Sequence, residues 1–132
     1  MPDFVYDPPV PTKVIQPFVQ RVDLRERGKI IATARWHFTA SNDGVAQVLD
    51  LTVLPDHQRR GNGSTLLNAV IAQAVAFGKT GGIPIRRIWI AVEQKTQVKA
   101  RAFLTRNGFH HVATISELLA HQDSLVYMRS LD

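Results

Sequence analysis

The chain has 132 residues, no cysteine and a formal net charge of +5. This length suits a single domain that buries about two-thirds of its unfolded surface, and the missing cysteines exclude disulfides and thiolate chemistry, as is typical of a cytoplasmic protein. The basic residues are scattered along the chain, which argues against nucleic acid as a partner, and no apolar run approaches the ~20 residues that cross a membrane.

The N-terminal part of the chain predicts three strands. Residues 1–12 hold four prolines and predict an extended arm, so we expect one domain over residues 13–132. Three stretches with alternating or β-rich side chains follow, and short turns separate them. They predict an antiparallel meander with strands over residues 18–26, 30–39 and 45–54.

The middle of the chain predicts a helix and then a buried strand. Apolar residues recur at helical spacing over residues 63–77, and Gly78 is expected to end this helix. The β-rich run 87–92 reads as a buried strand. Because it follows a helix, it should lie parallel to the strand that ends at Leu54.

The C-terminal part predicts a second helix and two more strands. The helix is expected over residues 96–106, before the terminating pair Asn107-Gly108. Strands are expected at 109–114 and 125–129, with a helical turn at 116–120 between them. The predicted architecture is a mixed α/β layer in which helices cover the sheet.

The most informative stretch connects the third strand to the first helix. It reads Gln58-x-x-Gly61-x-Gly63 after Pro55, which is neither the Walker pattern nor the GxGxxG fingerprint. Such a turn aims backbone N–H groups at one point, at the positive end of the helix dipole, where a phosphate or pyrophosphate binds well. Arg59 and Arg60 add positive charge. The alternative is a glycine-rich turn that binds no ligand.

This strand–loop–helix block resembles the pyrophosphate loop of the GNAT family of N-acetyltransferases, whose pattern is Gln/Arg-x-x-Gly-x-Gly/Ala. The resemblance implies an α/β (α+β) fold with a mixed, mostly antiparallel sheet. In that fold a central parallel strand pair splays at the cofactor site, and helices lie on both faces. Family members usually carry one or two helices between the first two strands, whereas here only residues 27–29 separate them. Either those helices are absent or the first strand lies near residues 13–16.

The second predicted helix matches another family pattern in part. Ala100, Phe103, Gly108 and Phe109 stand where the family has its alanine, aromatic or leucine, glycine and phenylalanine, and Gln97 replaces the usual asparagine. Leu104 stands at the position of a tyrosine that often protonates the departing thiolate, so the obvious general acid is missing.

The resemblance implies that acetyl-CoA is bound by the end of the third strand, the glycine loop and the second helix. The implied contact residues are Leu51, Thr52, Val53, Leu54, Gln58, Arg59, Arg60, Gly61, Asn62, Gly63, Ser64, Gln97, Ala100 and Phe103. The pantetheine arm would lie along residues 51–54, and the N–H of Val53 would polarise the thioester carbonyl.

Asp50 is the best candidate for the base that deprotonates an acceptor amine. In a regular strand it shares a face with Val48 and Thr52, opposite Leu49 and Leu51. An acid that is exposed to water or paired with an arginine remains the alternative.

Other residues offer weaker candidates for proton transfer. A histidine (His37, His110 or His111) would substitute for the missing acid if it faced the cleft, and Tyr127 would either reach the cleft or pack in the core. No metal site is indicated, because His57, His110, His111 and His121 lack carboxylate-supported ligand spacing.

The predicted function is transfer of an acetyl or acyl group from acetyl-CoA to a primary amine by direct attack. The acceptor would be a small molecule or a protein, and no membrane partner is expected. The alternative is a non-catalytic acyl-CoA-binding or sensor protein of the same fold. Exposed apolar sheet edges would suit a homodimer.

Overall fold

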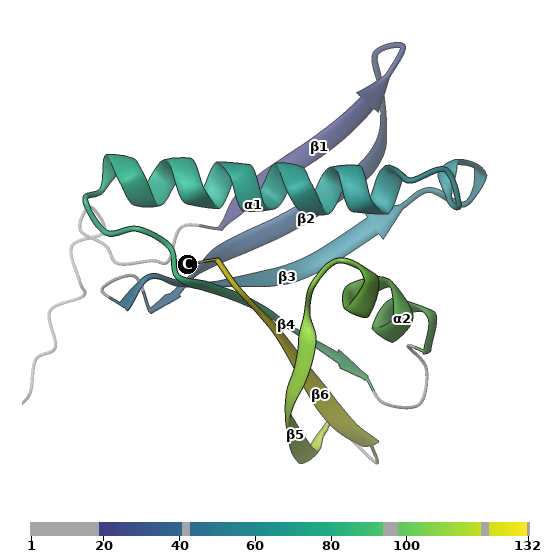
Figure 1. Ribbon diagram of the computed structural model, residues 1–132. Coiled ribbons are helices and arrows are strands. Elements are labelled where there is room, and N and C mark those ends of the chain that lie inside the picture. Colours follow the sequence, from purple (N-terminus) through teal and green to yellow (C-terminus); the bar gives the residue numbers. More distant parts are fainter. Residues whose placement is uncertain (1–18, 41–42, 94–97, 120–121, 132) are drawn as a thin grey trace, which may run out of the picture.

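The computed structural model describes residues 19–40, 43–93, 98–119 and 122–131 (Figure 1). It contains one six-stranded sheet in the order β1-β2-β3-β4-β6-β5, together with two α-helices. The elements are β1 (Gln20–Glu26), β2 (Lys29–Ala40), β3 (Val45–Val53), the short 3-10 helix η3 (Pro55–His57), α1 (Asn62–Thr80), β4 (Arg87–Glu93), α2 (Val98–Arg106), β5 (His110–Leu119) and β6 (Gln122–Ser130). The predicted arm over residues 1–12 lies outside the described residues.

The first three strands form the predicted antiparallel meander. β1 pairs with β2, and β2 pairs with β3. The two-residue turn Arg27-Gly28 joins β1 to β2, and both residues have positive φ, at 52° and 83°. No helix therefore separates these two strands, while the alternative first strand at residues 13–16 lies outside the described part of the chain.

β3 and β4 form the predicted parallel pair, and they separate after three residue pairs. Val45–Gln47 pair with Arg87–Trp89, and no pair follows toward the carboxyl ends of the strands. On the other side of β3, the register with β2 shifts at Leu49, since Arg35 pairs with Asp50 and Trp36 pairs with Val48. This extra residue bends the strand, and a gap opens between β3 and β4 next to it.

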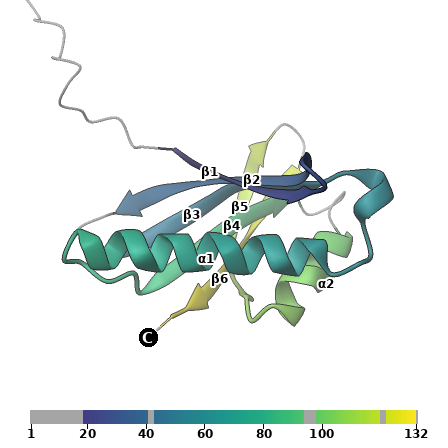
Figure 2. The ribbon, with the colours of Figure 1, turned by 90° about the horizontal axis from the view of Figure 1, so that it is seen from above.

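Helix α1 covers one face of the meander, as Figures 1 and 2 show. Its apolar stripe packs on the fully buried Trp36, whose indole Nε1 donates a hydrogen bond of 2.7 Å to Gln73. The expected end at Gly78 was wrong, because α1 continues to Thr80. Gly78 is instead buried against the segment that leads from α1 to β4. A Cβ at Gly78 would lie 2.8 Å from the carbonyl oxygen of Ile83 in that segment.

Helix α2 lies on the same face of the sheet as α1 among the described residues. Phe103 of α2 would contact a Cβ at Gly63 of α1 at 3.1 Å, and Leu104 belongs to the buried cluster that includes Trp36 and Tyr127. The expected fold class is confirmed, but helices on both faces are not seen in the described residues. The opposite face of β1–β3 carries polar side chains and is called the outer face below.

The C-terminal strands are longer than expected. β5 and β6 form an antiparallel pair, with register shifts after His111 and after Ile115. The predicted helical turn at 116–120 was wrong for residues 116–119, which continue β5 as a strand. Neither helix in the described residues has both the length and the apolar character needed to span a bilayer.

Candidate functional site

Two adjoining hollows open along the splayed strands. The gap hollow, of about 410 Å³, lies between β3 and β4, and the loop hollow, of about 470 Å³, lies beside the turn before α1. They share Leu51, Ala100 and Phe103, so they form one continuous groove. Both volumes fall within the roughly 300–1,000 Å³ of small-molecule sites.

The turn before α1 has the backbone geometry of an anion site. Arg59 and Gly61 both have positive φ, at 64° and 80°. Gly61 precedes the helix without a side-chain cap, and the N–H of Thr65 is bonded to the carbonyl oxygen of Gly61. The N–H groups of the first turn therefore have no acceptor within the helix, and the helix dipole favours negative charge at this end.

The loop hollow is lined by basic side chains and by no acidic one among the described residues. Arg59 comes from the turn, while Lys99 and Arg106 come from α2. The two α2 residues were not among the contact residues expected from the sequence. Their spacing was a usable signal, because residues 99, 103 and 106 fall at i, i+4 and i+7 on one helix face. Three cations around one hollow suit a ligand with several phosphate charges.

The end of β3 presents main-chain groups to the groove. The N–H of Leu54 donates to the carbonyl oxygen of Ile31 at 2.9 Å, and Ala32 is the partner of Val53 in the ladder. In antiparallel alternation, this turns the N–H and C=O of Val53 away from β2, toward the gap. The amide Nε2 of Gln58 donates to the carbonyl oxygen of Val53 at 3.0 Å. The turn and the strand end are thereby tied together.

Glycine at position 63 lets the two helices meet at the groove. A Cβ at this position would lie 3.1 Å from Cε1 and 3.3 Å from Cζ of Phe103. Phe103 lines both hollows. A side chain at position 63 would therefore displace the aromatic ring that connects them.

The gap hollow carries the acidic groups of the site. Its lining is mostly apolar, with Asp50 on β3, Glu93 on β4 and Ser124 on β6 as its charged and hydroxyl-bearing residues. Asp50 and Glu93 come from the two strands that border the gap. The hollow thus combines apolar walls with a carboxylate on each bordering strand.

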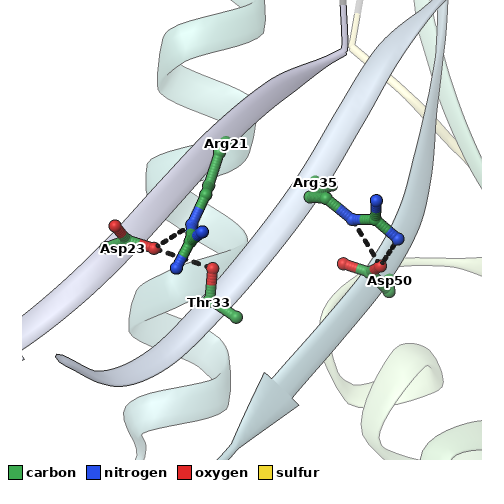
Figure 3. A network of polar contacts seen from close by, with 5 residues as sticks. All are labelled: Arg21, Asp23, Thr33, Arg35 and Asp50. Carbon is green, nitrogen blue, oxygen red and sulfur yellow. Dashed lines mark hydrogen bonds and ion pairs between the residues drawn. The ribbon is translucent and has the colours of Figure 1, made fainter.

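Asp50 lies on the outer face and forms an ion pair with Arg35 of β2 (Figure 3). Both Nε, at 2.7 Å, and Nη2 of Arg35 donate to Oδ2 of Asp50, and this contact raises the pKa of Arg35. The expected face was partly wrong. Asp50 does share its face with Thr52, but the extra residue Leu49 places Val48 on the core face.

Most of the other predicted contact residues line the groove. They are Leu51, Val53, Gln58, Arg59, Gly61, Gly63, Ser64, Ala100 and Phe103. Thr52, Leu54, Arg60 and Asn62 are not among the lining residues; Thr52 is opposite Thr33 in the ladder. Gln97 lies outside the described residues.

The weaker candidates for proton transfer do not line either hollow. His37 contacts Gln47 at 2.9 Å, and His111 contacts Thr114 at 3.0 Å. Tyr127 is buried, and its hydroxyl accepts a hydrogen bond of 3.4 Å from Nε of Arg101. Of its two expected roles, Tyr127 therefore has the one of packing in the core. Within the described residues, no three His, Asp or Glu side chains gather as metal ligands.

Comparison with protein families identifies a match over most of the chain. The model of the acetyltransferase (GNAT) family matches residues 9–109. A curated relative, an N-acetyltransferase of Methanocaldococcus jannaschii described as uncharacterized, is 29% identical over 92 residues. That alignment covers 70% of this chain and 38% of the relative, so the chain spans well under half of the relative's length.

Solved structures with the same fold include three acetyltransferases. The IAA acetyltransferase from Bacillus cereus has a TM-score of 0.74 at 13% identity, covering 86% of this chain and 78% of that one. The ribosomal-protein-S18-alanine N-acetyltransferase from Escherichia coli has a TM-score of 0.70 at 20% identity, covering 86% and 70%. A GNAT family acetyltransferase from Elizabethkingia anophelis, solved with acetyl-CoA bound, has a TM-score of 0.69 at 13% identity, covering 86% and 76%.

Proposed function

Because the chain belongs to the acetyltransferase (GNAT) family, we propose that it transfers an acetyl group from acetyl-CoA to a primary amine. The observation that carries this proposal is the charge pattern of the groove. The loop hollow is lined by Arg59, Lys99 and Arg106, while the adjoining gap hollow is lined by Asp50 and Glu93. An anionic acyl donor and a cationic amine acceptor fit these two ends.

The donor end binds phosphate and guides the thioester. First-turn N–H groups of α1 and the cations of the loop hollow hold the pyrophosphate. The pantetheine amides pair with the main chain of β3 at Leu51 and Val53, whose groups face the gap by ladder alternation. The thioester then lies where the two hollows meet, next to Phe103.

The acceptor end supplies the base. Asp50 takes a proton from the ammonium group of the acceptor, directly or through a water molecule. The neutral nitrogen attacks the thioester carbon, a C–N bond forms, and the N–H of Val53 stabilises the oxyanion. The C–S bond then breaks. The proton left on the attacking nitrogen passes through water to the thiolate, and a thiol with a pKa of about 8.5 is a tolerable leaving group.

A second candidate function is acyl-CoA binding without catalysis. Leu104 lines the gap hollow and is only 2% exposed, so the position of the usual tyrosine offers no proton. A sensor of acyl-CoA levels needs the loop hollow but not the base.

Turnover measurements separate the two functions. The protein is mixed with acetyl-CoA and a panel of amines, and release of the CoA thiol is followed. Amine-dependent release that falls at least about tenfold in Asp50→Asn supports acetyl transfer. Tight CoA binding by calorimetry with no release on any amine supports the sensor instead.

Removal of the two cationic side chains on α2 tests the donor site. We expect Lys99→Ala combined with Arg106→Ala to weaken CoA binding by about tenfold or more at low salt, because each removed cation is close to phosphate charge. Lys79→Ala, at the other end of α1, serves as the control and should leave the affinity unchanged. Equal affinities of both variants would contradict this placement of the donor.

The acceptor is a small molecule or a protein amine. The Escherichia coli neighbour is, by its name, an acetyltransferase for an alanine of a ribosomal protein, so this fold serves a protein acceptor there. A homodimer through an exposed sheet edge also remains part of the proposal, to be tested by the mass in solution.

A further inference from the structure

The outer mouth of the gap hollow displays a charge pair with unused hydrogen-bonding groups. Both bonds from Arg35 go to Oδ2 of Asp50, so the pair uses neither Oδ1 of Asp50 nor Nη1 of Arg35. The side chains are 55% and 36% exposed. An ion pair this exposed contributes little to stability, and stability therefore gives no strong reason for its position.

The position of the pair suggests a ligand. Asp50 lines the gap hollow, and Arg35 is its direct cross-strand partner on β2. Arg35 is not itself a lining residue, but its guanidinium lies against the carboxylate of Asp50, as Figure 3 shows. A hydrogen-bond acceptor that lines the hollow and a donor beside it therefore stand side by side.

We propose that the Arg35–Asp50 pair selects acceptors that carry a carboxylate beside the amine, namely free α-amino acids. The ammonium group binds Oδ1 of Asp50, and the carboxylate binds the guanidinium of Arg35, whose planar donors suit carboxylates. A polyamine or a protein amine lacks this neighbouring carboxylate. The inference rests on the proposed function, because it assigns the acceptor of that same site.

The outer face also provides a matched control pair. Nε of Arg21 donates to Oδ1 of Asp23 at 2.8 Å, and the hydroxyl of Thr33 donates to the same oxygen at 2.7 Å (Figure 3). Arg21 is 58% exposed, close to the value for Arg35. Unlike the Arg35–Asp50 pair, the Arg21–Asp23 pair contains no residue that lines a hollow, so its loss should not affect the acceptor.

The test compares three acceptors that differ only in the carboxylate: free α-amino acids, their α-amides and the corresponding decarboxylated amines. With saturating acetyl-CoA, we expect kcat/KM for the free acids to exceed the others by at least about tenfold. Arg35→Gln should remove this preference by lowering the value for the acids more than the values for the other two classes. Arg35→Lys should restore part of it, and Arg21→Gln should leave all values within about twofold.

Equal turnover of the three acceptor classes, or equal behaviour of Arg35→Gln and Arg21→Gln, would overturn the inference and leave acetyl transfer intact. If no amine is acetylated, the proposed function fails instead. Calorimetry of the amino acid with the protein–CoA complex then tests the pair without turnover. Binding that is lost in Arg35→Gln and kept in Arg21→Gln supports the inference, and absence of binding by the unmodified protein rejects it.

Discussion

At the scale of single residues, Leu49 decides how the site is divided. As the extra residue of β3, it places Val48 on the core face and Asp50 on the outer face beside Arg35. The same irregularity lies where the parallel pairing with β4 has ended. The inserted residue thus places the apolar Val48 and the charged Asp50 on opposite faces of the sheet, because a bulge changes the direction of the side chains next to it.

Gly63 gives the first prediction at this scale. Gly63→Val should weaken CoA binding by about tenfold, or roughly 1.4 kcal/mol, because the new side chain would push Phe103 out of the shared part of the groove. The measurement is isothermal calorimetry with CoA. Ala72→Val, on the exposed side of the same helix, is the control and should bind CoA normally. If Gly63→Val binds CoA with unchanged affinity, the ring of Phe103 is not part of the donor site.

Asp23 gives a prediction about pH. Hydrogen bonds from Arg21 and then Thr33 lower the pKa of Asp23 from its ordinary value of 3.8. A lowered folded-state pKa contributes stability that is present above the ordinary value and is lost as the pH falls through the folded-state value. Asp23→Asn should therefore be less stable than the unmodified protein at pH 7, and the difference should be smaller at an acid pH below 3.8.

Urea unfolding at both pH values measures this difference. A difference between Asp23→Asn and the unmodified protein that persists unchanged in acid would mean that the hydrogen bonds do not act through the carboxylate charge.

At the scale of elements, the end of α1 depends on the close return of the chain toward β4. Gly78→Ala should destabilise the protein by about 1–2 kcal/mol, because overpacking against a backbone that cannot move outweighs the better helix propensity of alanine. The carbonyl oxygen of Ile83 would lie 2.8 Å and the nitrogen of Ile85 3.0 Å from the added Cβ.

Gly81→Ala is the matched control for this change. Its φ is −81°, and its nearest neighbour, the carbonyl oxygen of Phe77, would lie 3.5 Å from a Cβ. This variant should be neutral or more stable by up to about 1 kcal/mol. Urea unfolding compares the two. If Gly78→Ala and Gly81→Ala are equally stable, the backbone at Ile83 and Ile85 moves to make room for the methyl group at position 78.

At the scale of the whole molecule, donor binding should be visible as thermal stabilisation. The groove is built from β3, β4, the turn before α1 and α2, so a ligand in it is held only by the folded chain. CoA at about 100 times its Kd adds about 2.7 kcal/mol, which for 132 residues raises Tm by roughly 10 °C. Adenosine at the same concentration, without phosphates, should raise it far less, and equal shifts would reject the anion site.

Local pattern determined most of the elements and the position of the loop. The alternation of apolar residues indicated the meander, helical spacing indicated both helices, and the glycines beside Arg59 indicated the turn proposed as an anion site, because each of these signals lies within a few consecutive residues. The same reasoning misplaced the end of α1 and the segment 116–119. At Gly78 the reason lies in distant contacts, since its role is to admit the backbone of Ile83 and Ile85.

The sequence by itself determined that a strand, a basic glycine turn and a helix follow one another, since those preferences are local. Only the tertiary structure decided which side chains meet across that turn. It brought Lys99 and Arg106 of α2 to the loop hollow, paired Asp50 with Arg35 fifteen residues earlier, and placed Glu93 on the facing strand. These neighbours come from different strands and helices, and strand register and packing, which the order of residues does not display, determine where they meet.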